Sequence, residues 1–273
     1  MRGRSRQAYA EFGERLDAAV GRDGRTAQTI GEALFGFAGL LRDQPAVRRA
    51  LTDPGRSGDD RAGLVRALVG DQLDPAAVEL IAAGVRERWA GPGDLMAAIE
   101  EFGVAAHLAG ADREGRLDDV EDELFRFGQV VQGEPALRAA LLDQAAPAES
   151  RRELVRTLLA DRAEPVTVRL VEQVVLGRRD RTTVEAALNR VGELAARQRR
   201  RRVAVVRVAA PLTTGHRERL EQALATHTGG PVHLNVVVEP DLVGGVKVEM
   251  GDEVVDGTVR SRLADVERRL SGR

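Results

Sequence analysis

Histidine and serine side chains are the groups in this chain that could bind a metal or carry out nucleophilic catalysis. None of the histidines stands in an HExxH or comparable zinc spacing, and they are too scattered in sequence to suggest a ligand cluster. The serines have no histidine at the distance that a catalytic triad motif would give. We therefore expect no metal site and no enzyme, and we expect the histidines to lie at the surface or in turns. The residues concerned are His107, His216, His227, His233, Ser5, Ser150 and Ser261.

Acidic residues are dense in places, as at Asp118-Asp119 and from Glu121 to Glu123. At such a density they are typical of a solvated surface more than of an acid/base pair. A nucleotide site would need a glycine-rich turn that leads into Gly-Lys-Ser/Thr, and the pair Gly244-Gly245 is not followed by that sequence. The sequence therefore predicts no cofactor.

The arginine run from Arg199 to Arg202 could pair with phosphates or with carboxylates. It falls at the end of a predicted helix, where cations favour the negative end of the helix dipole, and no aromatic residues interleave for base stacking. We interpret it as a solvated helix end. Contact with a partner protein is the second interpretation, and nucleic-acid binding is the third.

Composition narrows the possible classes of protein. A chain of 273 residues is long enough for about two domains. Its net charge of only -2, with 31% charged residues, gives no field that would attract nucleic acid or a membrane. Cysteine is absent, which fits a reducing compartment, and the chain shows neither a signal peptide nor an apolar run of the roughly 20 residues that span a bilayer. We expect a cytoplasmic protein that reaches the membrane only through its partners.

An internal repeat covers the first two thirds of the chain at an offset of 90 residues without gaps. The triplet that starts at Glu11 recurs at Glu101, and Leu34-Phe35 recurs as Leu124-Phe125. Agreement in one register over this length predicts that the segment was duplicated and that both copies fold alike.

Apolar residues within each copy recur at the helical period. Breaks at glycine and proline place the helix ends. The helix that contains Glu101 corresponds to the first helix of the chain, so that one helix closes the first copy and opens the second. We predict helices near residues 5–20, 25–42, 45–52, 59–72, 75–90, 94–110, 118–132, 135–142, 148–161, 165–178 and 182–200.

The last part of the chain changes to a mixed pattern. Strands are predicted at residues 203–208 and 232–238, with a helix at 216–226 between them. Alternation from Val246 to Met250 predicts a strand, and a turn, a short strand and a helix with Val259, Leu263, Val266 and Leu270 on one face follow. The fold class is thus α+β: two tandem all-helical bundles, residues 1–103 and 104–200, and a small α+β domain, residues 203–273.

This carboxy-terminal segment resembles the signature of the delta subunit of F-type ATP synthases, the counterpart of the mitochondrial oligomycin-sensitivity-conferring subunit. The resemblance covers about the last quarter of the chain, and Tyr9-Ala10 in the opening helix is similar to the family's start. A long form with a duplicated helical domain resembles actinobacterial versions of the subunit. The matching residues are Glu239, Leu242, Gly244, Gly245, Val246, Val248, Glu249, Gly251, Asp252, Asp256, Gly257, Ser261, Arg262 and Leu263.

The resemblance implies a non-catalytic subunit of the peripheral stalk, or stator, that joins the catalytic head to the b-type stalk on the cytoplasmic face of the plasma membrane, so that rotation drives ATP synthesis. It implies two partners, the amino-terminal helices of the alpha subunits and the b-type subunit, and no nucleic acid. The alternative function is an arginine-rich helical-repeat adaptor that binds nucleic acid or a regulatory protein. Trp89 is expected in the core, or else as an anchor for a partner helix. The residues that could line a groove for such a helix are Tyr9, Phe12, Leu16, Val85 and Trp89.

Overall fold

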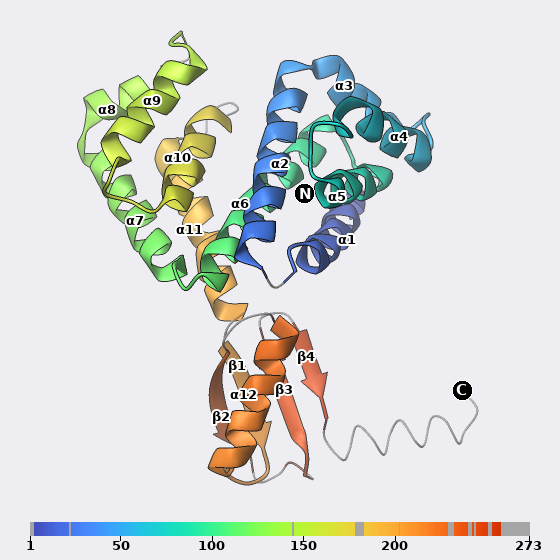
Figure 1. Cartoon of the computed structure of the whole chain (residues 1–273), viewed down its shortest axis with the longest axis vertical. Helices are drawn as coiled ribbons and strands as arrows, with labels where there is room; N and C mark the ends of the chain where they lie inside the picture. Colours follow the sequence, from blue (N-terminus) through green and yellow to red (C-terminus); the bar gives the residue numbers. More distant parts are fainter. Residues whose placement is uncertain are drawn as a thin grey trace. The chain divides into compact units, whose positions relative to one another are not determined.

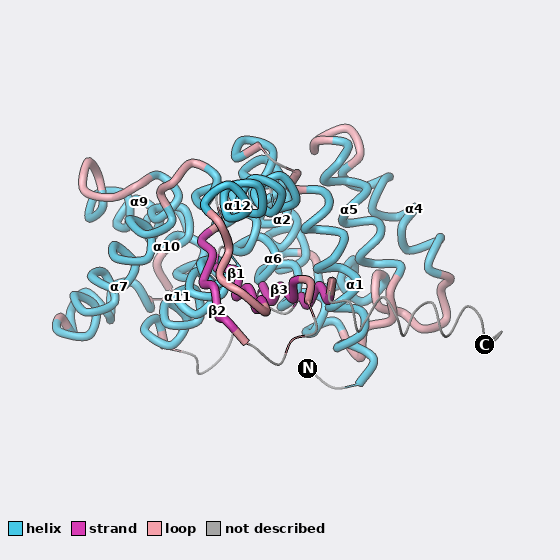
Figure 2. Tube along the Cα trace, turned by 90° about the horizontal axis from the view of Figure 1, so that it is seen from below, coloured by secondary structure: helices cyan, strands magenta, loops and turns pink. Residues whose placement is uncertain are grey.

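The computed structural model describes residues 3–21, 23–143, 145–177, 183–201, 203–228, 232–239, 242, 244–250 and 253–257. The chain divides into two compact units, residues 1–195 and 196–273. The described part of the first unit consists of helices and their connections, and the described strands all belong to the second unit (Figures 1 and 2).

The first half of the helical unit contains α1 (Gly3–Ala19), α2 (Gly24–Asp43), α3 (Pro45–Ala50), α4 (Gly58–Val69), α5 (Pro75–Arg86) and α6 (Pro92–Arg113). The second half contains α7 (Leu117–Gly133), α8 (Pro135–Leu142), α9 (Ala148–Leu159), α10 (Pro165–Gly177) and α11 (Val184–Arg201), which ends beyond the unit's boundary. Each observed helix matches a predicted one to within a few residues at either end. The helices of the second half follow those of the first at the offset of the repeat.

Local sequence explains where the helices start. Proline stands in the first turn of α3, α5, α6 and α8, where its missing N–H costs no hydrogen bond. The side chain of Ser57 accepts from the backbone N–H of Asp60, and Asp60 accepts in return from Ser57. This capping box satisfies two N–H groups that the first turn of α4 would otherwise leave unpaired.

Helix α6 is shared by the two halves. Its residues Leu95, Ile99 and Phe102 belong to the core of the first half, whereas Val104 and Leu108 belong to the core of the second. A helix that is apolar all round must be buried all round, and α6 meets this requirement by packing into two cores. The prediction that one helix closes the first copy and opens the second is confirmed.

Close packing of α2 on α6 depends on glycine. A Cβ atom at Gly103 would lie 2.5 Å from two ring carbons of Phe35, so only a residue without a side chain leaves room for this ring. The Phe35 ring also stacks on the imidazole of His107, with 4.9 Å between ring centroids. This contact contradicts the expectation for His107, which is 3% exposed, while His216 and His227 are exposed as predicted.

The second unit is a four-stranded sheet with one helix across it (Figure 1). Its elements are β1 (Val203–Val208), α12 (Thr214–Thr228), β2 (His233–Val238), β3 (Val246–Met250) and β4 (Glu253–Asp256), in the strand order β2-β1-β3-β4. Strand β1 is parallel to β2 and antiparallel to β3, and β3 and β4 form a hairpin. Alternate residues of β1, Ala204, Val206 and Val208, are buried with α12 packed against them, which is the alternation that predicted the strand.

The predicted α+β fold class, helical repeats followed by a small mixed domain, is therefore confirmed. The helical part forms one compact unit with two apolar cores, and the sheet unit has a third. The finer division of the helical part at residues 103 and 104 stays a prediction. The predicted last helix lies outside the described residues.

Candidate functional site

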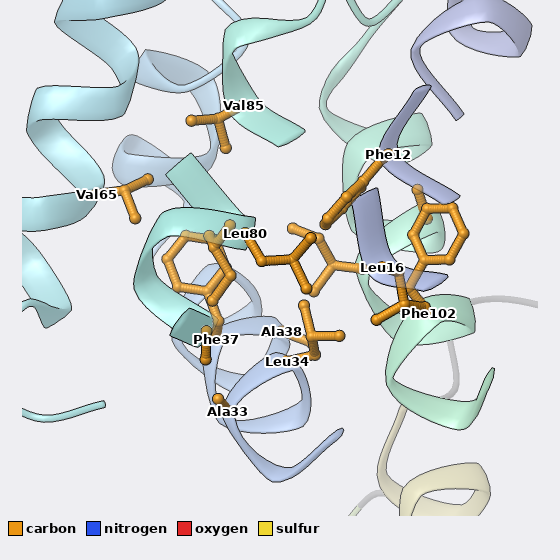
Figure 3. Close-up of a cluster of buried hydrophobic side chains, with 14 of the residues drawn as sticks. Phe12, Leu16, Ala33, Leu34, Phe37, Ala38, Val65, Leu80, Val85 and Phe102 are labelled. Atoms are coloured by element: carbon orange, nitrogen blue, oxygen red, sulfur yellow. The ribbon is translucent and has the colours of Figure 1, made fainter. Parts of the chain in front are cut away.

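The residues predicted to line a groove between α1 and α5 are instead core residues. Phe12, Leu16, Val85 and Trp89 are all at most 7% exposed, and Figure 3 shows three of them directed into the packed interior of the first half. Tyr9 is partly buried, and its ring stacks on Phe102 at 4.5 Å between centroids. The apolar face of α1 is used to close the first core, so these five residues do not form an open groove. For Trp89 the core interpretation is correct, and its indole N–H donates to the backbone carbonyl of Gly84 at 2.9 Å.

An open groove does lie in the second half, between α6, α10 and α11. Its volume is about 570 Å³, and most of the side chains along it are small or apolar. We refer to it as the α10 groove. It is lined by Gly93, Asp94, Ala97, Glu100, Glu101, Val104, Gln173, Val174, Gly177, Ala186, Ala187, Arg190, Val191 and Leu194.

This groove is open because the two halves of the helical unit share α6. In the first half the ring of Phe12, on α1, lies so close to Gly84 on α5 that a Cβ atom there would be 2.8 Å from the ring. In the second half the repeat puts Phe102 in the place of Phe12 and Val174 in the place of Gly84. Phe102, however, packs into the first core, at 4.7 Å from the ring centroid of Phe12. Among the described residues, no aromatic ring therefore lines the corresponding space beside α10.

Polar groups at the α10 groove are fixed from both halves of the unit. The carboxylate of Glu101 accepts a hydrogen bond from the hydroxyl of Tyr9 at 2.7 Å and one from the guanidinium of Arg190 at 2.8 Å. This hydrogen bond and the negative charge of Glu101 raise the pKa of Arg190. The amide Nε2 of Gln173, a residue that is 8% exposed, has no hydrogen-bond partner among the described residues. A buried amide donor without a partner is costly, so a carbonyl or carboxylate of a bound molecule would stabilise it.

Several of the described C-terminal signature residues lie in strand β3 of the sheet unit or next to it. Gly244 and Gly245 have φ angles of +72° and +85°, a left-handed conformation that glycine adopts without strain. The N–H of Gly257 donates to the carbonyl of Val246 at 2.9 Å and closes the open end of the hairpin. Val248 is buried in the core of the sheet unit. Gly244 and Gly245 thus lead into β3, while Val248 and the Gly257 N–H fix the hairpin to the core and to itself.

The acidic signature residues Glu239 and Glu249 meet at Arg207, on the neighbouring strand β1. Arg207 donates to Glu239 and forms an ion pair of 3.4 Å with Glu249, which also pairs with Lys247 at 2.7 Å. The hydrogen bonds that Arg207 donates to Glu239 and Glu249 raise the pKa of Arg207, while Lys247 and then Arg207 lower the pKa of Glu249. The pair of acids thus binds a cation of the chain itself. Arg207 was not among the predicted site residues, although its alternation with the buried valines of β1 places it on the opposite face.

Other predictions of the sequence have different outcomes. Leu242 is partly buried and Asp256 is exposed. Gly251, Asp252, Ser261, Arg262 and Leu263 lie outside the described residues. Within the described ranges, no group of three or more acidic, histidine or cysteine residues is placed to hold a metal ion. None of the helices in these ranges combines the length and hydrophobicity that a membrane span requires.

The chain is similar to known proteins over its whole length. The family model described as "ATP synthase delta (OSCP) subunit" matches residues 104–270. The ATP synthase subunit delta of Streptomyces coelicolor is 43% identical over 271 residues, covering 99% of this chain and 98% of the relative. The one from Salinispora tropica is 46% identical over 270 residues, covering 98% of each chain.

These similarities decide between the two functions that the sequence left open. The family model matches well over half of the chain, and the relatives align over the first half as well, so they share its long form. Both findings support the resemblance drawn from the signature and leave the nucleic-acid adaptor without support. The chain therefore belongs to the ATP synthase delta (OSCP) subunit family, and it is a peripheral-stalk subunit of the F-type ATP synthase.

Proposed function

We propose that this subunit connects the catalytic head to the b-type stalk without a reaction of its own. In this proposal the helical unit holds amino-terminal helices of the alpha subunits, and the sheet unit joins the b-type subunit. The subunit then lies at the cytoplasmic face of the plasma membrane, which it reaches only through these partners. Its task is to keep the head from turning while the central rotor drives ATP synthesis.

The α10 groove is the observation that carries this proposal. Amphipathic helices bind in apolar grooves through side chains at positions i, i+3, i+4 and i+7. At about 570 Å³, with mostly apolar walls, the groove falls in the common size range of binding sites, roughly 300–1,000 Å³. Of the acidic residues that line it, Glu100 pairs with Arg42 and Glu101 with Arg190, so the apolar walls are the main feature that a partner helix would recognise.

The second half of the helical unit is the better candidate for holding the head. The α10 groove lies between helices of this half, and the family match begins at residue 104. In the first half, Tyr9, Phe12 and Phe102 fill the corresponding space with the chain's own rings. This packing argues against two equivalent binding sites for the head. Two such sites would have raised the affinity, because the second contact forms at a high effective concentration.

Exposed apolar residues support a docking role for the sheet unit. Val254 and Val255 on the edge strand β4 are 58% and 59% exposed, and β4 pairs with the signature strand β3. Exposed edge strands can pair with a segment of another chain. We propose that the b-type stalk subunit covers this edge.

The test is to block the groove without touching the core. Ala97 lines the groove and is exposed, so Ala97→Trp should fold normally and exclude a partner helix. Its repeat counterpart on α1 is the exposed residue Gln7, and Gln7→Trp is the matched control. We expect Ala97→Trp to weaken the binding of the full chain to an alpha-subunit amino-terminal peptide at least tenfold, and Gln7→Trp to leave it unchanged. Equal binding by both variants would refute the groove as the site, and nucleotide turnover by the purified chain would refute the non-catalytic role.

A further inference from the structure

Phe125 on α7 is the most exposed large apolar side chain of the described helical unit. Its side chain is 68% exposed, although its repeat counterpart, Phe35 on α2, is 3% exposed. An isolated exposed apolar residue needs no explanation by itself. Phe35, however, contacts an arginine side chain, and this contact shows which group the same position of the repeat can bind.

Phe35 and Glu32 bind an arginine from the other half of the unit. The guanidinium of Arg169, on α10, lies over the Phe35 ring at 4.8 Å from its centroid. The same guanidinium donates to both carboxylate oxygens of Glu32, at 2.8 and 2.9 Å. An aromatic ring and a carboxylate three residues apart on a helix thus bind one arginine by a cation–π contact and an ion pair.

The repeat places the same two chemical groups on α7. Asp122 corresponds to Glu32, and Phe125 corresponds to Phe35. The described residues place no cation over the Phe125 ring, and the ion pair of Asp122 is with Arg126, one turn further along the helix. Both members of that pair are more than 70% exposed, so it is weak and easily exchanged. We refer to Asp122 and Phe125 as the α7 receptor.

The chain cannot cover Phe125 with its own residues in the way that it covers Phe35. Phe35 is accommodated because Gly103, on α6, has no side chain. The repeat counterpart of Gly103 on α11 is Glu193, which leaves no such space for a ring. A second copy of this chain that continued the repeat would place Glu79, on α5, where α10 carries Arg169. That acid would face Asp122, and like charges repel.

We infer that the α7 receptor binds an arginine side chain of a helix in a different protein of the assembled ATP synthase. Asp118 and Glu121 on the preceding turns add negative charge and favour a basic helix. This interaction surface is separate from the α10 groove, which α7 does not line. Binding at the α7 receptor and binding in the α10 groove can therefore be refuted independently of each other.

Photo-cross-linking in the assembled enzyme tests this inference. Benzoylphenylalanine replaces Phe125 in the full chain, and the same group at the exposed residue Ala139 on α8 serves as the control. We expect a cross-link from position 125 to another subunit, within one helical turn of an arginine. A cross-link to a second copy of this chain, a cross-link to a segment without an arginine, or a yield no higher than the control would overturn the inference.

Rebinding of the full chain to membranes depleted of it provides a second test. Loss of the ring in Phe125→Ala or of the charge in Asp122→Asn should weaken rebinding by about threefold to thirtyfold, the range expected for a cation–π contact that becomes desolvated. The conservative variant Asp122→Glu should bind like the unchanged chain. Because both positions are exposed, the thermal unfolding of these variants should stay unchanged. Rebinding of Phe125→Ala with unaltered affinity would refute the α7 receptor.

Discussion

The close approach of α2 and α6 makes the substitution Gly103→Ala destabilising, although alanine is the better helix former. The new Cβ would lie 2.5 Å from two ring carbons of Phe35, about 1 Å inside the optimal contact distance. The ring has little room to move, because His107 stacks on one side and the guanidinium of Arg169 lies over it. Overpacking of this kind costs about 1–3 kcal/mol, against a gain of about 1 kcal/mol in helix propensity. We expect a net loss in the free energy of unfolding of up to about 2 kcal/mol.

The control is Gly36→Ala, on the exposed side of α2, where nothing lies within 4 Å of the added Cβ. It should stabilise the chain by up to about 1 kcal/mol, so the two substitutions should have opposite signs. Urea unfolding followed by fluorescence suits the comparison, because Trp89 is the only tryptophan and lies in the core of the first half. A Gly103→Ala variant that is as stable as the unchanged chain, or that gains as much stability as Gly36→Ala, would refute the close contact as the cause.

Three further predictions use other features of the structure. Phe35 and Phe125 are repeat counterparts, but their substitution by alanine should have different effects on the free energy of unfolding, measured with urea. Phe35→Ala, at the buried position, should lower it by about 3–5 kcal/mol, and Phe125→Ala, at the exposed position, should change it by no more than about 0.5 kcal/mol. Burial opposes ionisation of Glu32, but the imidazole and the guanidinium beside it hold its pKa below the ordinary value of 4.5. Its stabilising effect is therefore present above pH 4.5 and lost as the pH falls through the lowered pKa, so the acid-induced loss of stability should be smaller in Glu32→Gln, as urea midpoints at stepwise lower pH would show. Gly245→Ala forces alanine into a left-handed conformation, which should cost about 1–2 kcal/mol and speed hydrogen exchange in β3.

The sequence predicted most of the fold because each signal was local. Helical periodicity, prolines in first turns and glycine breaks placed the helices to within a few residues, and the repeat let each half check the other. The alternation in β1 and β3 predicted the strands in the same way. Sharing of α6 was also visible in the sequence, because Glu101 corresponds to Glu11 of the opening helix.

The candidate groove could not be predicted correctly from the sequence. The spacing of Phe12 and Leu16 shows that one face of α1 is apolar, but a face that closes a core and a face that lines a groove have the same period. The α10 groove depends instead on which core receives Phe102, and this is a property of tertiary packing. The change from Gly84 to Val174 between the copies was one signal in the sequence that packing beside α5 and α10 differs.

Helix α6 also has a mechanical consequence. Two domains joined by an exposed linker can bend about it, so that part of an applied torque is lost in the joint. Here the connection is a helix buried in both cores, and any bend would separate Phe102 from Phe12 in one core and Leu108 from its neighbours in the other. Closely packed interiors resist such deformation and transmit strain. Force applied to the second half of the helical unit is therefore transmitted to the first half through packed side chains, and the two halves move as one rigid body.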